Sequence, residues 1–314
     1  MSTGFNVRME DRNKILLYHL ESSDGTTATV VPQFGNNCFS FEVGEPILEP
    51  IGFDAFVAKP TSFGIPLLFP FPNRIRDGRY SFDGKEFEVD PPRHGFVRDK
   101  AWRVEESGSS EEDGAWLKST FDAGNFSDRA LSAYPSLFQI DVTYRVRPNE
   151  LSIETVWRNT GEEAMPTGFG IHPYFVRPRN GTVTVPADSR LELVDSLPTG
   201  SRLELDDSND LRASRPVAGL ELDDIYTDII GEGIVRCSLV DNDRGIETIV
   251  EFDKANFPFV VVYTPPEPRA AICIEPNTCP TDAFNLQPTG FDANVLRLEA
   301  GDEHRADIRI RVKR

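Results

Sequence analysis

The chain has 314 residues, of which 39% are hydrophobic and 27% charged, a balance typical of a globular protein and not of a disordered one. Its 51 acidic and 33 basic residues give a formal net charge of -18, which argues against nucleic acid and membrane surfaces as partners and favours a small neutral molecule. The four cysteines are too few for a disulfide framework, and no apolar run resembles a signal or a membrane span, so we expect a cytoplasmic protein.

The segment PLLFPFPNRIRDGRY, residues 66–80, is apolar and rich in proline up to Arg74. A guanidinium there could hold substrate hydroxyls through its fork of donors, or it could pair with Asp77 at the surface. The next residues, RYSFDGKEFEV, predict a β-hairpin that turns at Asp83 and Gly84, because Asp-Gly between two alternating strands is a strong hairpin signal.

Residues 91–96, PPRHGF, place His94 between two prolines and a glycine. These neighbours restrict the backbone to a shaped loop, and shaped loops often carry functional residues. Taken alone, however, the hexapeptide favours an idle surface-loop histidine over a functional one.

The centre and the end of the chain predict further antiparallel sheet. We expect one short helix at 127–136, a hairpin over 138–159 that turns at 148–150, and a last hairpin over 295–312 that turns at Gly301 and Asp302. Because strands follow one another without amphipathic helices between them, the fold class is all-β, a large antiparallel β-sandwich. Without a repeat or a linker, residues 1–314 are expected to form a single domain.

The segment TGFGIHPYF, residues 167–175, contains a second histidine, His172. If it is one strand, Gly168, Gly170 and His172 share a face, and the two missing side chains leave room for a ligand. A crowded strand crossing beside a core histidine is the other interpretation.

In AAICIEPNTCPTDAFN, residues 270–285, an apolar strand ends at Glu275. Burial there would raise the pKa of this carboxyl above its ordinary value, as a general base acting near neutral pH requires. The alternative is a glutamate at the strand end that points to solvent. Glu275 joins His94, His172 and Arg74 in a set of polar residues that lacks the spacing of metal ligands and includes no activated nucleophile. Such a set favours proton transfer, with the two histidines expected near their usual pKa of about 6.5.

Four ordered stretches make the chain resemble the aldose 1-epimerase (galactose mutarotase) family: PNRIRDGRYSFDGKEF at 72–87, RHGFVRDKAW at 93–102, HPYF at 172–175 and EPNTCPTDAFN at 275–285. The resemblance implies the family's β-supersandwich and a cofactor-independent, metal-free isomerase, either a monomer or a homodimer. It would interconvert the α and β anomers of a free aldohexose.

By this resemblance His172 is the general acid that protonates the ring oxygen, and Glu275 is the general base that deprotonates the anomeric hydroxyl. His94 polarises the sugar near the ring oxygen. Sugar hydroxyls would be held by Asn73, Arg74 and Asp223 of DDIY, with Asp224 as the alternative aspartate, and Tyr174 would line the site.

The sequence departs from galactose mutarotases after HPYF, at DDIY and at the Pro276 that follows the glutamate, so a preference for galactose is not implied. Two other functions stay open. A hexose-phosphate mutarotase would need a phosphate site, which Arg74, Arg76, Arg93 and Arg98 could provide. A sugar-binding protein without turnover would need no acid and base.

Overall fold

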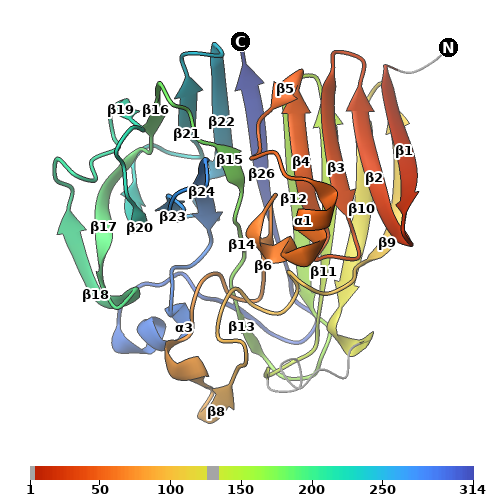
Figure 1. Ribbon diagram of the computed structural model, residues 1–314. Helices are drawn as coiled ribbons and strands as arrows, with labels where there is room; N and C mark the ends of the chain where they lie inside the picture. Colours follow the sequence, from red (N-terminus) through yellow and green to blue (C-terminus); the bar gives the residue numbers. More distant parts are fainter. Residues whose placement is uncertain (1–3, 126–133) are drawn as a thin grey trace.

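A computed structural model describes residues 4–125 and 134–314 of the chain (Figure 1). Sheet dominates it, and the helical segments are short: α1 (Phe53–Ala58), α3 (Ala283–Leu286) and the 3-10 turns η1 (Pro60–Ser62), η2 (Arg76–Gly78), η3 (Ala123–Asn125) and η4 (Gln287–Thr289). The helix expected at 127–136 lies largely outside the described residues. None of the described helices has the length and apolar character that crossing a membrane requires.

A nine-stranded antiparallel sheet runs the full width of the molecule. In spatial order its strands are β19 (Arg215–Pro216), β16 (Gly181–Thr184), β21 (Ile234–Asp241), β22 (Ile246–Asp253), β26 (Glu303–Lys313), β12 (Glu150–Asn159), β11 (Phe138–Arg147), β10 (Gly114–Asp122) and β9 (Arg103–Ser110). The sequence of β26 explains its place, since Ala306, Ile308, Ile310 and Val312 alternate with exposed charged residues and face the core.

Two smaller sheets cover this sheet, one on each half (Figure 1). The first contains β1 (Phe5–Arg12), β2 (Ile15–Ser22), β3 (Thr26–Val31), β4 (Asn37–Val43) and β5 (Glu45–Pro46). The second contains β18 (Leu197–Glu204), β17 (Ala187–Val194), β20 (Asp223–Ile229), β23 (Phe259–Tyr263), β24 (Ala271–Asn277), β14 (Gly170–Ile171) and β6 (Leu67–Leu68), with β15 (Tyr174–Val176) also paired to β24. One large hydrophobic cluster joins residues of all three sheets, so the all-β sandwich expected from the sequence is confirmed.

The predicted hairpins have different outcomes. The Asp83-Gly84 hairpin is present as β7 (Arg79–Phe82) and β8 (Lys85–Glu88), and the hairpin over 138–159 is present as β11 and β12, turning at Pro148 and Asn149. The hairpin over 295–312 is wrong. Its first half is β25 (Leu296–Leu298), which pairs with β13 (Met165–Thr167), whereas β26 lies between β12 and β22. Long-range pairing in the wide sheet takes precedence over the local turn signal.

Candidate active site

His172 and Glu275 face each other at the centre of the second sheet. All residues of β24 are buried, and Glu275 lies on the same face as Cys273, which is opposite Tyr174 of β15. Continuing that register by two residues places His172 beside Glu275, and His172 Nε2 lies 3.2 Å from Glu275 Oε1. The contact does not have hydrogen-bond alignment, and His172 Nδ1 and Glu275 Oε1 both lack a hydrogen-bond partner.

Burial determines the charge states of this pair. Glu275 is 3% exposed and His172 8% exposed. Desolvation raises the pKa of the Glu275 carboxyl well above its ordinary value, and the negative charge of Asp223 raises it further. Desolvation lowers the pKa of His172 to about 3. The strand-end glutamate therefore does not point to solvent, and the expectation of two histidines near pKa 6.5 is wrong, because both rings are removed from water.

His94 is presented by a strained loop. Its φ of +61° lies in the left-handed region, which a residue with a side chain adopts at a cost. The loop is held against residues 69–73: His94 N–H donates to Asn73 O at 2.6 Å, and Phe96 N–H donates to Phe69 O. Gly95 is required there, because a Cβ would lie 1.9 Å from Phe69 O. His94 is 5% exposed, so it is not an idle surface residue.

Burial and nearby positive charges also lower the pKa of His94. The backbone N–H of Asn73 donates to His94 Nδ1 at 3.1 Å, and Arg93 Nε–H donates to His94 Nε2, also at 3.1 Å. A neutral imidazole accepts at one nitrogen only. The two donors therefore compete for one acceptor, and the tautomer of His94 decides which of the two hydrogen bonds forms.

The rings of the site touch one another. The His94 and His172 centroids are 5.7 Å apart with the rings edge to face, and His172 stacks on Tyr174 at 4.5 Å. The Arg269 guanidinium lies over the Tyr174 ring, 4.4 Å from its centroid. The same guanidinium forms an ion pair with Glu49. These contacts fix the plane of the His172 ring.

Gly168 and Gly170 do not leave open space for a ligand. The segment is divided into β13, β14 and β15, so it is not one strand. A Cβ on Gly168 would lie 2.2 Å from Cys279 Sγ, and one on Gly170 would lie 1.8 Å from Asn277 Oδ1. The room is filled by residues that follow Glu275, and the interpretation as a crowded strand crossing is the one that the structure supports.

The remaining residues expected in the site lie around the pair. Arg74 Nη1 donates to Asn73 Oδ1 at 2.9 Å and is not paired with Asp77. The two aspartates differ: Asp224 pairs with Arg190 at 3.1 Å, whereas Asp223 is exposed and close enough to act electrostatically on Arg74 and Glu275. Of the two, Asp223 borders the buried pair.

Sequence reasoning missed part of the surroundings. Arg269 follows a proline-rich turn, and Tyr263 is the last residue of β23, with its ring edge to face with His172 at 6.0 Å. Neither residue belongs to a motif, and long-range pairing alone brings them here. Arg93 and Arg98, on either side of HGF, lower the pKa of His172 by their charge.

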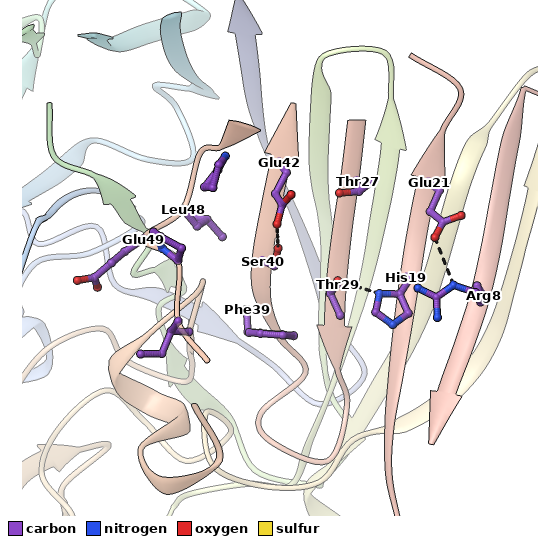
Figure 2. A pocket seen from close by; sticks show the side chains of 13 residues that line it. Arg8, His19, Glu21, Thr27, Thr29, Phe39, Ser40, Glu42, Leu48 and Glu49 are labelled. Atoms are coloured by element: carbon purple, nitrogen blue, oxygen red, sulfur yellow. Dashed lines mark hydrogen bonds and ion pairs between the residues drawn. The ribbon is translucent and has the colours of Figure 1, made fainter. Parts of the chain in front are cut away.

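A separate hollow lies on the face of the β1–β5 sheet that is turned away from the core (Figure 2). Its charged side chains interact with one another: His19 contacts Thr29 and Glu10, Arg8 contacts Glu21, and Ser40 donates to Glu42. These groups are already paired, whereas His172 Nδ1 and Glu275 Oε1 have no hydrogen-bond partner.

The sequence as a whole matches a known protein family. The model of the family described as aldose 1-epimerase matches residues 17–311. The chain belongs to the aldose 1-epimerase family. The match spans nearly the whole chain and supports a function of the sugar epimerase or mutarotase type.

Similar proteins agree with this assignment. The uncharacterized protein YihR of Escherichia coli (strain K12) is 26% identical over 255 residues, covering 76% of each chain. A galactose mutarotase-like protein from Clostridium acetobutylicum has a TM-score of 0.88 at 20% identity over 99% of both chains. Galactose 1-epimerase from Lactobacillus acidophilus NCFM has a TM-score of 0.80 at 15% identity, again over 99% of both. At these identities the two structures show the fold.

Proposed function

We propose that the protein interconverts the α and β anomers of a free aldohexose, with His172 and Glu275 as the acid and base. The observation that carries this proposal is the buried contact of 3.2 Å between His172 Nε2 and Glu275 Oε1. Two titratable groups within reach of one sugar ring are what reversible opening of a hemiacetal needs.

In the proposed reaction the sugar separates the two groups. Glu275 takes the proton of the anomeric hydroxyl, His172 gives a proton to the ring oxygen, and the C1–O5 bond breaks to leave an open-chain aldehyde. Rotation about C1–C2 and reclosure on the other face form the second anomer, with His172 taking back its proton and Glu275 returning the other. His94 binds and polarises the sugar near the ring oxygen, and Asn73, Arg74 and Asp223 hold hydroxyls.

In the proposed cycle His172 and Glu275 exchange one proton within the pair. Burial favours the uncharged tautomer in the sugar-free protein, with the proton on Glu275 and a neutral His172. Transfer of that proton across 3.2 Å produces the form that opens the ring. Because both tautomers have the same net charge, this transfer adds no net charge to the site.

Polarimetry of freshly dissolved α-glucose and α-galactose tests the proposal. We expect catalysed mutarotation, and we expect Glu275→Gln and His172→Asn each to lower the rate about a hundredfold or more while sugar affinity changes little. Unchanged rates in both variants would reject the mechanism. If the unmutated protein binds sugars but gives no rate above buffer, it is a sugar-binding protein.

A hexose-phosphate mutarotase is the second candidate, favoured by the arginines. Among the described residues, Arg74, Arg93 and Arg98 have no carboxylate at ion-pair distance, whereas Arg76 pairs with Asp282. Arg74 and Arg93 form an isolated antiparallel β-bridge. Burial and the charge of Arg93 lower the pKa of Arg98. Unpaired cations in a chain of net charge -18 fit a phosphate.

Comparison of glucose with glucose 6-phosphate separates the two substrates. If the arginines bind phosphate, Arg93→Gln raises the KM for glucose 6-phosphate about tenfold or more and leaves that for glucose nearly unchanged. Arg79→Gln is the matched control, because Arg79 is exposed beside Glu88 and outside the site. An equal effect of Arg93→Gln on both sugars would reject the phosphorylated substrate.

A further inference from the structure

Cys273 has no task in the proposed reaction, yet its side chain lies beside the acid and the base. The thiol is fully buried on β24, on the same face as Glu275. From the sequence alone Cys273 is expected to be a small hydrophobic core residue, as buried cysteines usually are. It packs against Ala271, Tyr174 and Tyr263.

Three different ligand types converge at this point. One ring nitrogen of His172, the Cys273 Sγ and one Glu275 oxygen all lie within 4.8 Å of one another. The strand geometry produces this cluster, since Cys273 and Glu275 alternate on one strand and His172 lies opposite Glu275 on the neighbouring chain segment. It is the one such group of three that the described residues form.

Two polar atoms of the cluster residues have no hydrogen-bond partner. His172 Nδ1 and Glu275 Oε1 are buried and have no hydrogen-bond partner, and both belong to side chains that are at least nine-tenths buried. Buried polar atoms without partners are uncommon and call for a ligand or another explanation. Here two of them belong to neighbouring potential ligands.

The ligand set selects the type of ion. A thiolate, an imidazole and a carboxylate are typical of zinc, whereas magnesium and calcium prefer oxygen ligands alone. Three protein ligands leave a fourth tetrahedral position open. Bonds of about 2.0 to 2.3 Å to one ion require ligand atoms roughly 3.3 to 3.8 Å apart, so small rotamer adjustments within the 4.8 Å cluster suffice.

We propose that His172, Cys273 and Glu275 form a binding site for a thiophilic divalent cation such as Zn²⁺, and that the bound ion inhibits the enzyme. The ion binds the two side chains that the proposed reaction uses as acid and base, and it competes there with their proton. It is therefore an inhibitor and not a cofactor. The site also makes the enzyme sensitive to the free concentration of such ions.

Cobalt titration tests the site without any activity measurement. Added to the purified, chelator-treated full chain, Co²⁺ should produce a near-ultraviolet thiolate charge-transfer band that saturates at one equivalent and disappears when Zn²⁺ is added. Cys273→Ser should abolish the band. Cys237→Ser should retain it, because Cys237 is an equally buried thiol on β21, outside the cluster.

Inhibition is measured by polarimetry, with each variant compared with its own rate in the presence of chelator. We expect Zn²⁺ to remove most of the activity, Mg²⁺ to have no effect, and Cys273→Ser to raise the half-inhibiting Zn²⁺ concentration at least about tenfold. His172→Asn is the second variant for the cobalt titration should Cys273→Ser fail to fold, and it should weaken Co²⁺ binding while keeping a thiolate band.

A band that is absent, or one that Cys273→Ser leaves intact in a folded protein, overturns the metal site. A band without Zn²⁺ inhibition overturns the inhibitory role. If the protein catalyses no mutarotation, the cobalt titration still decides the metal site, so failure of the proposed function and failure of this inference are separate results.

Discussion

Replacing His172 by Asn should change how the stability of the protein depends on pH. In the unfolded chain this ring has its ordinary pKa of 6.5, and burial lowers the folded value to about 3. Between these values the unfolded state binds a proton that the folded state does not. The contribution of His172 to the free energy of unfolding is therefore complete above pH 6.5 and is lost as the pH falls toward the folded pKa.

The size of the effect follows from the same two values. Each pH unit below 6.5 changes the free energy of unfolding by about 1.4 kcal/mol per group, as long as the folded ring stays neutral. At pH 5.0 the loss is about 2 kcal/mol. An asparagine does not titrate. Between pH 7.5 and pH 5.0 the free energy of unfolding of His172→Asn should therefore fall by about 2 kcal/mol less than that of the parent.

Urea unfolding at the two pH values measures this difference, and Glu275→Gln provides a comparison of opposite sign. Because burial raises the pKa of Glu275 above 4.5, the parent loses stability at this group as the pH rises. Glu275→Gln should therefore gain stability relative to the parent at pH 7.5 more than at pH 5.0. If His172→Asn has the same pH dependence as the parent, the ring is not kept neutral by burial and the reasoning is refuted.

Two further predictions concern the loop and the charges around the pair. Gly95→Ala should lower the free energy of unfolding by more than about 2 kcal/mol and lower the mutarotation rate, because a Cβ would meet Phe69 O. Gly84 has a similar positive φ but free space around it, so Gly84→Ala should lower the free energy of unfolding by only about 1 kcal/mol, as measured by thermal unfolding. Asp223→Asn should move both limbs of the pH profile of kcat/KM to lower pH, and Arg93→Gln should move them to higher pH, since these charges act oppositely on Glu275. Similar melting of the two glycine variants, or shifts in one direction for both charge variants, would contradict these expectations.

Local patterns predicted much of the fold. The Asp83-Gly84 turn and the alternation over 138–159 depend on neighbouring residues alone, and both hairpins form. The sequence over 295–312 has an equally clear local signal. Its second strand nevertheless pairs with β12 and β22, because its alternate apolar residues bury more surface inside the wide sheet than in a hairpin at the edge.

The candidate site also combines features that local sequence predicts with features that depend on distant parts of the chain. Motif residues such as His94, His172 and Glu275 could be named from sequence, whereas their environment could not. The pKa of His172 depends on how completely the sheets exclude water, and the crowding at Gly170 depends on Asn277, more than a hundred residues later in the chain. Arg269 and Tyr263 reach the site by strand pairing alone, without any motif.

The burial of His172 and Glu275 suits a reaction that must run equally well in both directions. Forming one anomer from the other requires each group to act once as acid and once as base. In water, a histidine and a glutamate differ by about two pKa units in favour of the charged pair. Desolvation acts against that preference at both residues, raising the pKa of Glu275 and lowering that of His172. The exposed charges of Asp223 and Arg93 then adjust the balance from the edge of the site. Changing those two charges is therefore expected to alter the pH range of catalysis, while changing the buried pair removes catalysis itself.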